Sequence, residues 1–179
     1  MLIMWETVNF MGGVCMSEQD LKQHRCCFTG HRPEKLSLSE KEIKLLLERA
    51  IDKAIADGFV TFISGMARGT DMWAAEIVLM RKKENTDIHL ICASPFEGFE
   101  ERWSNKEQEK YRDIIEQADL VKYICKQYSR DCFQIRNEWM VDKSSRVIAV
   151  YNGEPSGTGN TVRYALENGV EIENVLKNI

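Results

Sequence analysis

The stretch that most constrains the fold is residues 59–76, FVTFISGMARGTDMWAAE. It opens with a short aromatic and β-branched run, which is typical of a parallel strand buried on both faces. Gly65 and Gly69 then interrupt this run, and apolar residues recur at helical spacing from Trp73 to Val78. The pattern predicts a strand, a glycine turn and the start of a helix in immediate succession.

Such a turn predicts a site for an anion. The first N–H groups of a helix have no partner within the helix, and the helix dipole is positive there, so a phosphate group is favoured. Arg68 could clamp a phosphate with paired hydrogen bonds, or it could be a solvated loop residue. Asp71 would repel a phosphate, so we expect it to cap the helix or to accept a hydrogen bond from a ribose hydroxyl.

Strand-like and helix-like segments alternate along the rest of the chain. A capping box of Ser39 and Glu42 opens the first helix, and Gly58 ends it. We expect later helices at residues 99–118 and 133–143, and strands at residues 25–28, 59–63, 88–92, 120–124, 147–151 and 170–172. This alternation predicts an α/β fold that is Rossmann-like and doubly wound, with a mainly parallel sheet of about six strands and helices on both faces.

A second glycine-rich turn, at residues 153–161, opens the helix that follows the clearest core strand. Right-handed crossovers place every strand-to-helix turn on the same edge of a parallel sheet. That edge should therefore gather both glycine turns and the loop at residues 29–33, where His31 is either a base or a structural histidine. Two helix starts beside arginines predict a nucleotide or a phosphorylated ribose as the ligand.

Composition limits the alternatives. The chain has 179 residues, enough for one domain with a sizeable core. Its net charge of −4 argues against a nucleic acid as a partner. The six cysteines contain no C-x-x-C pair, and several lie in apolar runs, so we expect buried thiols in a reducing cytoplasm. The three histidines show no ligand spacing, and we expect no metal site and no required cofactor.

Residues 1–23 form an apolar but interrupted segment that lacks the pattern of a signal peptide and is too short to span a membrane. We expect a poorly ordered tail there and one domain at residues 24–179. One hypothesis is that Met16 is the true start of the protein, with the codons of Gly12 and Gly13 acting as a ribosome-binding sequence.

Several separated motifs resemble the SLOG superfamily of Rossmann-like proteins, which includes DprA and the LOG phosphoribohydrolases. The motifs are SGMARGTD at residues 64–71 and PSGTGNT at residues 155–161. Within that superfamily the chain most resembles the YpsA-like family, through Thr29-Gly30, residues 73–76, Arg136-Asn137 and residues 142–144. The resemblance implies a bacterial, cytoplasmic protein linked to cell division or to sensing of nucleotide derivatives, with a nucleotide-type ligand at the two glycine turns.

Two departures from the related families narrow the expected function. LOG enzymes carry a catalytic glutamate after a P-G-G-x-G-T turn, whereas this chain has Ser156 in the turn and Val162 and Arg163 in the acidic region. DprA-like DNA binding rests on basic surface and additional domains, for which this chain has neither the charge nor the length.

We therefore expect a nucleotide-binding or ADP-ribose-binding protein that acts as a sensor or regulator. The alternatives are a hydrolase of an N-glycosidic bond, with Glu76 or Asp142 as acid or base, a DprA-like nucleic-acid-associated protein, and a partner-binding module with a vestigial pocket. A homo-oligomer or a protein partner is left open. The expected ligand-binding residues are Thr29, Gly30, Arg32, Ser64, Gly65, Arg68, Gly69, Asp71, Arg136, Gly157, Thr158, Gly159 and Thr161.

Overall fold

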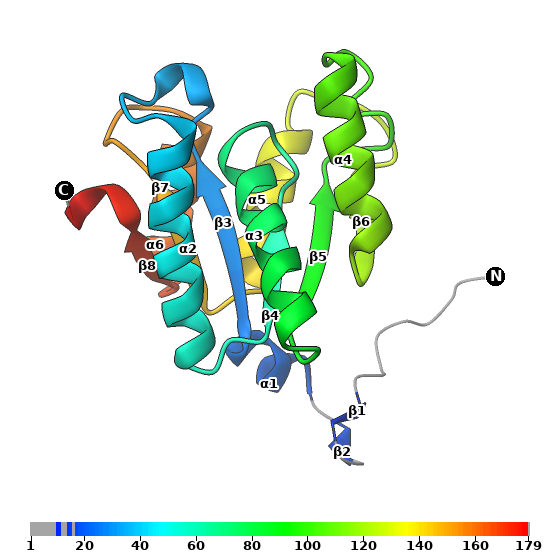
Figure 1. Cartoon of the computed structure of the whole chain (residues 1–179), viewed down its shortest axis with the longest axis vertical. Coiled ribbons are helices and arrows are strands. Elements are labelled where there is room, and N and C mark those ends of the chain that lie inside the picture. Colours follow the sequence, from blue (N-terminus) through cyan, green and yellow to red (C-terminus); the bar gives the residue numbers. More distant parts are fainter. Residues whose placement is uncertain (1–9, 12–13, 16, 179) are drawn as a thin grey trace.

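The computed structural model describes residues 10–11, 14–15 and 17–178. Its centre is a sheet of six parallel strands in the order β6-β5-β4-β3-β7-β8 (Figure 1). A separate antiparallel pair, β1 (Phe10–Met11) and β2 (Val14–Cys15), precedes it. The six strands are β3 (Arg25–Gly30), β4 (Thr61–Ser64), β5 (His89–Ser94), β6 (Leu120–Tyr123), β7 (Arg146–Val150) and β8 (Glu171–Asn174).

Helices cover both faces of this sheet, so the predicted doubly wound α/β fold is confirmed. Helices α2 (Glu40–Ala56), α3 (Thr70–Glu84) and α4 (Asn105–Gln117) lie on one face, and α5 (Cys132–Asp142) and α6 (Gly157–Glu167) lie on the other (Figure 1). Neighbouring strand residues face opposite layers: Phe62 packs in the core beneath α2 and α3, and Ile63 packs beneath α5 and α6.

The local signals explain where helices begin and end. Ser39 accepts a hydrogen bond from the Glu42 N–H, and Glu42 accepts one from the Ser39 N–H, so the predicted capping box starts α2. Gly58 follows the last turn of α2 with φ +93°, a conformation that residues with a side chain rarely adopt.

Two segments differ from the predicted pattern. Helix α4 begins at Asn105 rather than at residue 99, because Gly98 turns the chain with φ +78° and Ser104 forms a capping box with Glu107. Residues 18–23, expected within a poorly ordered tail, form helix α1 (Glu18–Gln23), and Glu18 pairs with Lys143 at 2.9 Å. Met16, the proposed alternative start, lies outside the described residues, as do residues 1–9.

The strand order also shows where the loops at the carboxyl edge diverge. Chain order runs outward from β3 in both directions, so the sheet has its switch point between β3 and β7. Here the two following loops lead to opposite faces, and open α/β sheets bind ligands at the carboxyl edge beside such a point. This edge carries two short 3-10 helices nearby, η1 (Pro33–Lys35) and η2 (Val175–Asn178).

Within the part of the chain that the structure describes, no helix is long and apolar enough to cross a lipid bilayer. No group of three or more metal-ligating side chains occurs among these residues either. Five described cysteines, Cys26, Cys27, Cys92, Cys125 and Cys132, are free thiols, and all but Cys125 are buried.

Candidate functional site

The glycine turn between β4 and α3 uses side chains of the turn itself to satisfy its amides. The Met66 N–H donates to Ser64 Oγ at 3.2 Å, and the Ala67 N–H donates to Asp71 Oδ2 at 3.2 Å. Ser64 Oγ in turn donates to the Asp71 carbonyl oxygen at 2.9 Å. The amides of Met66 and Ala67, in the loop just before α3, are therefore occupied, and Asp71 holds this part of the turn in place.

Arg136 supports the same turn from the interior. It projects from α5 and is 5% exposed, and its Nη1 donates to the carbonyl oxygen of Gly65. A Cβ atom at Gly65 would collide with this guanidinium and would lie 2.7 Å from Asp71 Oδ2. Gly65 is therefore required by the close approach of Arg136, and this arginine does not face an open surface.

The loop after β3 packs between the two glycine turns. Gly30 lies against Thr70, whose Oγ1 donates to the His31 carbonyl oxygen at 3.4 Å. Gly69 lies against Pro33, whose Cδ would be 2.7 Å from a Cβ atom at that glycine. The loop thus seals the first glycine turn from the side that faces β7.

Aromatic side chains also pack against one side of the second glycine turn. The His31 and Tyr151 rings lie 5.5 Å apart, and the Tyr151 hydroxyl would be 3.0 Å from a Cβ atom at Gly159. Both turns do reach one edge of the sheet, as the parallel topology requires. Packed side chains separate them, so the structure does not join them into the single hollow that we expected.

Side chains at the start of α6 are also engaged locally. Ser156 caps the helix by accepting a hydrogen bond from the Gly159 N–H at 3.1 Å, and the Thr161 hydroxyl donates to the Gly157 carbonyl oxygen at 2.9 Å. Thr158, like Thr29 on β3, is buried. Gly157 is exposed, and nothing lies within 4 Å of a Cβ atom placed there.

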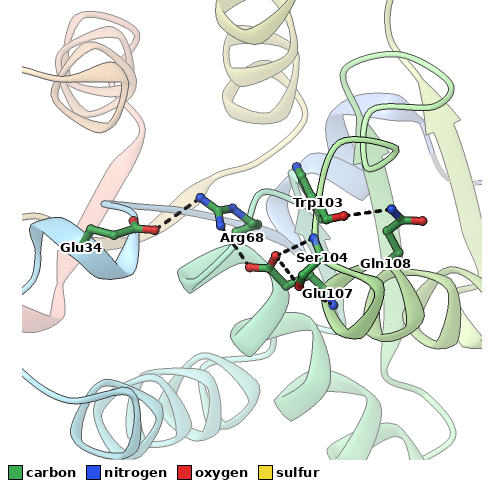
Figure 2. Close-up of polar contacts among 6 residues, drawn as sticks. All are labelled: Glu34, Arg68, Trp103, Ser104, Glu107 and Gln108. Carbon is green, nitrogen blue, oxygen red and sulfur yellow. Dashed lines mark hydrogen bonds and ion pairs between the residues drawn. The ribbon is translucent and has the colours of Figure 1, made fainter.

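The side chain of Arg68, in the first glycine turn, lies between two carboxylates. Its Nη2 lies 3.3 Å from Glu34 Oε1 on η1, and its Nη1 lies 3.1 Å from Glu107 Oε1 on α4 (Figure 2). Glu107 uses its other oxygen, Oε2, to accept a hydrogen bond from the Ser104 hydroxyl at 2.8 Å. Hydrogen bonding from Ser104 is the main reason that the pKa of Glu107 is lowered.

A cleft of about 1150 Å³ opens beside Arg68, between the loops that follow β4, β5 and β6. Aromatic side chains form much of its wall. Phe96 lies 5.8 Å from Phe99 and 5.7 Å from Tyr128, and Phe133 lies 5.7 Å from Phe99, measured between ring centroids. These edge-to-face contacts hold the rings against one another at the carboxyl edge of the sheet.

Sequence reasoning did not identify this aromatic cluster as part of a site. A signal was present, because Phe96 and Phe99 follow β5 while Tyr128 and Phe133 follow β6. β5 and β6 pair in parallel, so their following loops lie at the same edge. Reading the two loops together would have placed four aromatic residues beside Arg68.

Charged side chains of both signs complete the cleft. The basic residues are Arg32, Arg68, Arg102 and Lys126, and the acidic residues are Glu97, Glu101 and Glu107. Aromatic faces beside cationic groups suit a ligand that has both a planar ring and an anionic group. Arg32 and Arg68 are the two sequence-predicted binding residues that line this cleft.

The two candidate catalytic carboxylates lie far apart. Glu76 lies in the first half of α3, 2.8 Å from Lys44 Nζ, and lines a smaller cavity of about 340 Å³ together with Gly69 and Arg68. Asp142 is the last residue of α5, just before β7 begins, and accepts a hydrogen bond from the Tyr164 hydroxyl at 3.0 Å. Because α5 starts at the carboxyl edge of the sheet, its end lies at the opposite edge, away from both cavities.

The fold resembles that of solved DNA processing proteins. DNA processing protein A (DprA) from Streptococcus pneumoniae aligns with a TM-score of 0.62 and 21% identity over 85% of this chain. This chain spans only half the length of that protein. DprA from Helicobacter pylori, described for its single-stranded DNA binding mode, aligns with a TM-score of 0.59 and 16% identity, over 90% of this chain and 73% of that protein.

This likeness corrects one expectation from the sequence. We took the net charge of −4 as an argument against a nucleic-acid partner. A protein with a similar fold binds single-stranded DNA, so the expectation was wrong. The physical reason is that net charge sums over the whole chain, whereas a ligand meets local charges, and side chains of both signs line this cleft.

Sequence comparisons identify the family. UPF0398 proteins of Bacillus thuringiensis (strain Al Hakam) and Bacillus cereus (strain Q1) are each 32% identical over 154 residues, covering 82% of this chain and 84% of theirs. A family model named YpsA and described as the YspA SLOG family matches residues 26–175. The chain therefore belongs to the YpsA family of SLOG proteins.

Proposed function

We propose that this protein binds a ligand containing a nucleotide in the cleft at the carboxyl edge of its sheet, and that it acts as a sensor or regulator. The observation that carries this proposal is the combination of an aromatic cluster and four basic side chains around about 1150 Å³ of open space. That volume accommodates a ligand the size of a nucleotide or of ADP-ribose.

Each part of the ligand has a matching part of the cleft. The base would stack on the rings of Tyr128 or Phe96, since every base has a flat face that an aromatic ring can accept. The phosphate would meet Arg68 or Arg32, because guanidinium groups bind phosphate oxygens through paired hydrogen bonds. The resemblance to SLOG proteins implies a ligand of this class.

Neither carboxylate that the sequence offered as acid or base, Glu76 or Asp142, lines the proposed cleft, so neither supports cleavage of a ligand there. A hydrolase needs a carboxylate within hydrogen-bond reach of the bond that it breaks. Glu76 is paired with Lys44 and Lys110 in the neighbouring cavity, and Asp142 lies at the opposite edge of the sheet.

A second candidate ligand is single-stranded DNA. The observation that favours it is the fold shared with DprA from Helicobacter pylori, for which a single-stranded DNA binding mode is described. Aromatic stacking beside basic groups serves this polymer as well as it serves a free nucleotide. The three glutamates in the cleft limit how many consecutive phosphates it accepts, so we favour the small ligand.

A thermal-shift and calorimetric titration tests both candidates. The ligands are AMP, ADP-ribose and an oligodeoxythymidylate. A ligand at a hundred times its dissociation constant should stabilise the fold by about 2.7 kcal/mol. Binding of AMP or ADP-ribose supports the small-ligand proposal, and binding of the oligonucleotide alone supports the second candidate. If folded protein responds to none of them, the proposal is wrong.

A further inference from the structure

Arg68 is the cationic group best placed to serve the cleft, yet carboxylates of this same chain occupy it. Its two terminal nitrogens face Glu34 and Glu107, one on each side (Figure 2). A guanidinium binds the oxygens of a carboxylate and of a phosphate in the same way. A phosphate that binds the N–H groups of Arg68 now facing these carboxylates therefore competes with one of the two glutamates.

The two glutamates are held with different strength. Glu107 is anchored, because Ser104 donates to its Oε2 from both the hydroxyl and the backbone N–H, at 2.8 and 3.2 Å. Its side chain is 34% exposed. Glu34 is 63% exposed, and its one polar contact among the described residues is with Arg68, at 3.3 Å. Exposed ion pairs contribute little stability, so Glu34 is the partner that is more easily displaced from Arg68.

The position of this pair matters because Arg68 borders two cavities. Arg68 and Glu107 line both the aromatic cleft and the smaller cavity beside α3, whereas Glu34 lines only the smaller one. Glu34 therefore draws the guanidinium toward the smaller cavity. When Glu34 leaves, the Nη2 edge of Arg68 becomes free for another anion while Glu107 still fixes the side chain.

We propose that Glu34 is an internal competitor that occupies Arg68 when the cleft is empty and is displaced by the phosphate of the bound ligand. The proposal rests on the proposed function for the identity of the ligand. It adds a specificity rule: only a ligand with an anionic group releases Arg68, so a nucleoside without a phosphate leaves the Glu34 pair in place.

The test compares Glu34→Gln with the wild type by calorimetry, using AMP and adenosine as probes. Removing the competitor should tighten AMP binding by about two- to fivefold, the range that an exposed ion pair supports. Adenosine binding should stay unchanged. Glu109→Gln is the matched control, because Glu109 is an exposed glutamate on α4 that lines neither cavity and has no contact with Arg68 among the described residues.

Three outcomes would overturn the competitor role: no gain for Glu34→Gln, an equal gain for Glu109→Gln, or a gain for Glu34→Gln that persists in an Arg68→Ala background. The last comparison is a double-mutant cycle, which isolates the coupling between the two residues. If AMP fails to bind the wild type, inorganic pyrophosphate replaces it as the probe. Tighter pyrophosphate binding by Glu34→Gln would then retain the competitor role although the nucleotide proposal had failed.

Discussion

Arg136 Nη1 lies 3.7 Å from Asp71 Oδ2 beneath the first glycine turn, and both side chains are more than nine-tenths buried. Burial raises the pKa of the Asp71 carboxyl, and the guanidinium of Arg136 opposes that rise. Burial also lowers the pKa of Arg136. The charged form of each side chain is therefore stabilised by the other, and this pair fixes the turn that separates β4 from α3.

Arg136→Met should destabilise the protein strongly, because it leaves the Asp71 carboxylate buried without its partner. Breaking a buried pair in this way costs about 3–5 kcal/mol, which urea unfolding can measure. The double variant Arg136→Met with Asp71→Asn is the control, and it should recover much of the loss because no charge stays buried. Equal losses in the single and double variants would show that the pair is not the cause.

Gly65→Ala should also destabilise the fold, since the new methyl group would meet Arg136 and Asp71. Overpacking of this kind costs about 1–3 kcal/mol. Gly157→Ala is the matched control, because nothing lies within 4 Å of the added Cβ atom in the second glycine turn. The melting temperatures of both variants check the prediction, and similar values for the two would contradict it.

His31 should make stability depend on pH. The ring is 2% exposed, and desolvation lowers its pKa from the usual value. Below a pH of about 6.5 the unfolded chain takes up a proton that the native ring resists, so the free energy of unfolding falls as pH falls. In His31→Gln the drop in melting temperature between neutral and mildly acidic buffer should be smaller than in the wild type. The same substitution at the exposed His24 is the comparison, and an equal effect there would count against the role of burial.

Tyr128→Ala should weaken nucleotide binding without weakening the fold. The ring is 62% exposed and lines the cleft, so its loss removes a stacking surface but little of the core. Stacking of a base on an aromatic ring contributes about 1–3 kcal/mol, which corresponds to a loss of about fivefold or more in affinity. Calorimetry with AMP measures it. Tyr123→Ala, on the exposed strand β6, removes a comparable ring outside the cleft and should leave affinity unchanged.

Local signals determined much of the fold. The apolar run before Gly65 and the recurring apolar residues after Trp73 place a strand and a helix, because periodicity follows directly from which faces must be buried. Ser39 with Glu42 locates the start of α2 for a similarly local reason. The alternation of such segments was sufficient for the parallel sheet, and parallel pairing in turn brings the glycine turns to one edge.

Other features depend on contacts between residues that lie far apart in the chain. The sequence cannot show that Arg136 reaches 71 residues back to Gly65, or that Pro33 and Tyr151 pack against the two glycine turns. Likewise, Phe96 and Tyr128 become neighbours only because β5 and β6 pair in parallel.

The sequence by itself therefore determined the elements, their order and the edge where a ligand is expected, since these follow from local burial patterns and chain connectivity. Only the tertiary structure decided which residues at that edge remain open. Packing separated the two glycine turns and left the aromatic cleft beside Arg68 open, because the space at a sheet edge is set by which distant side chains fill it.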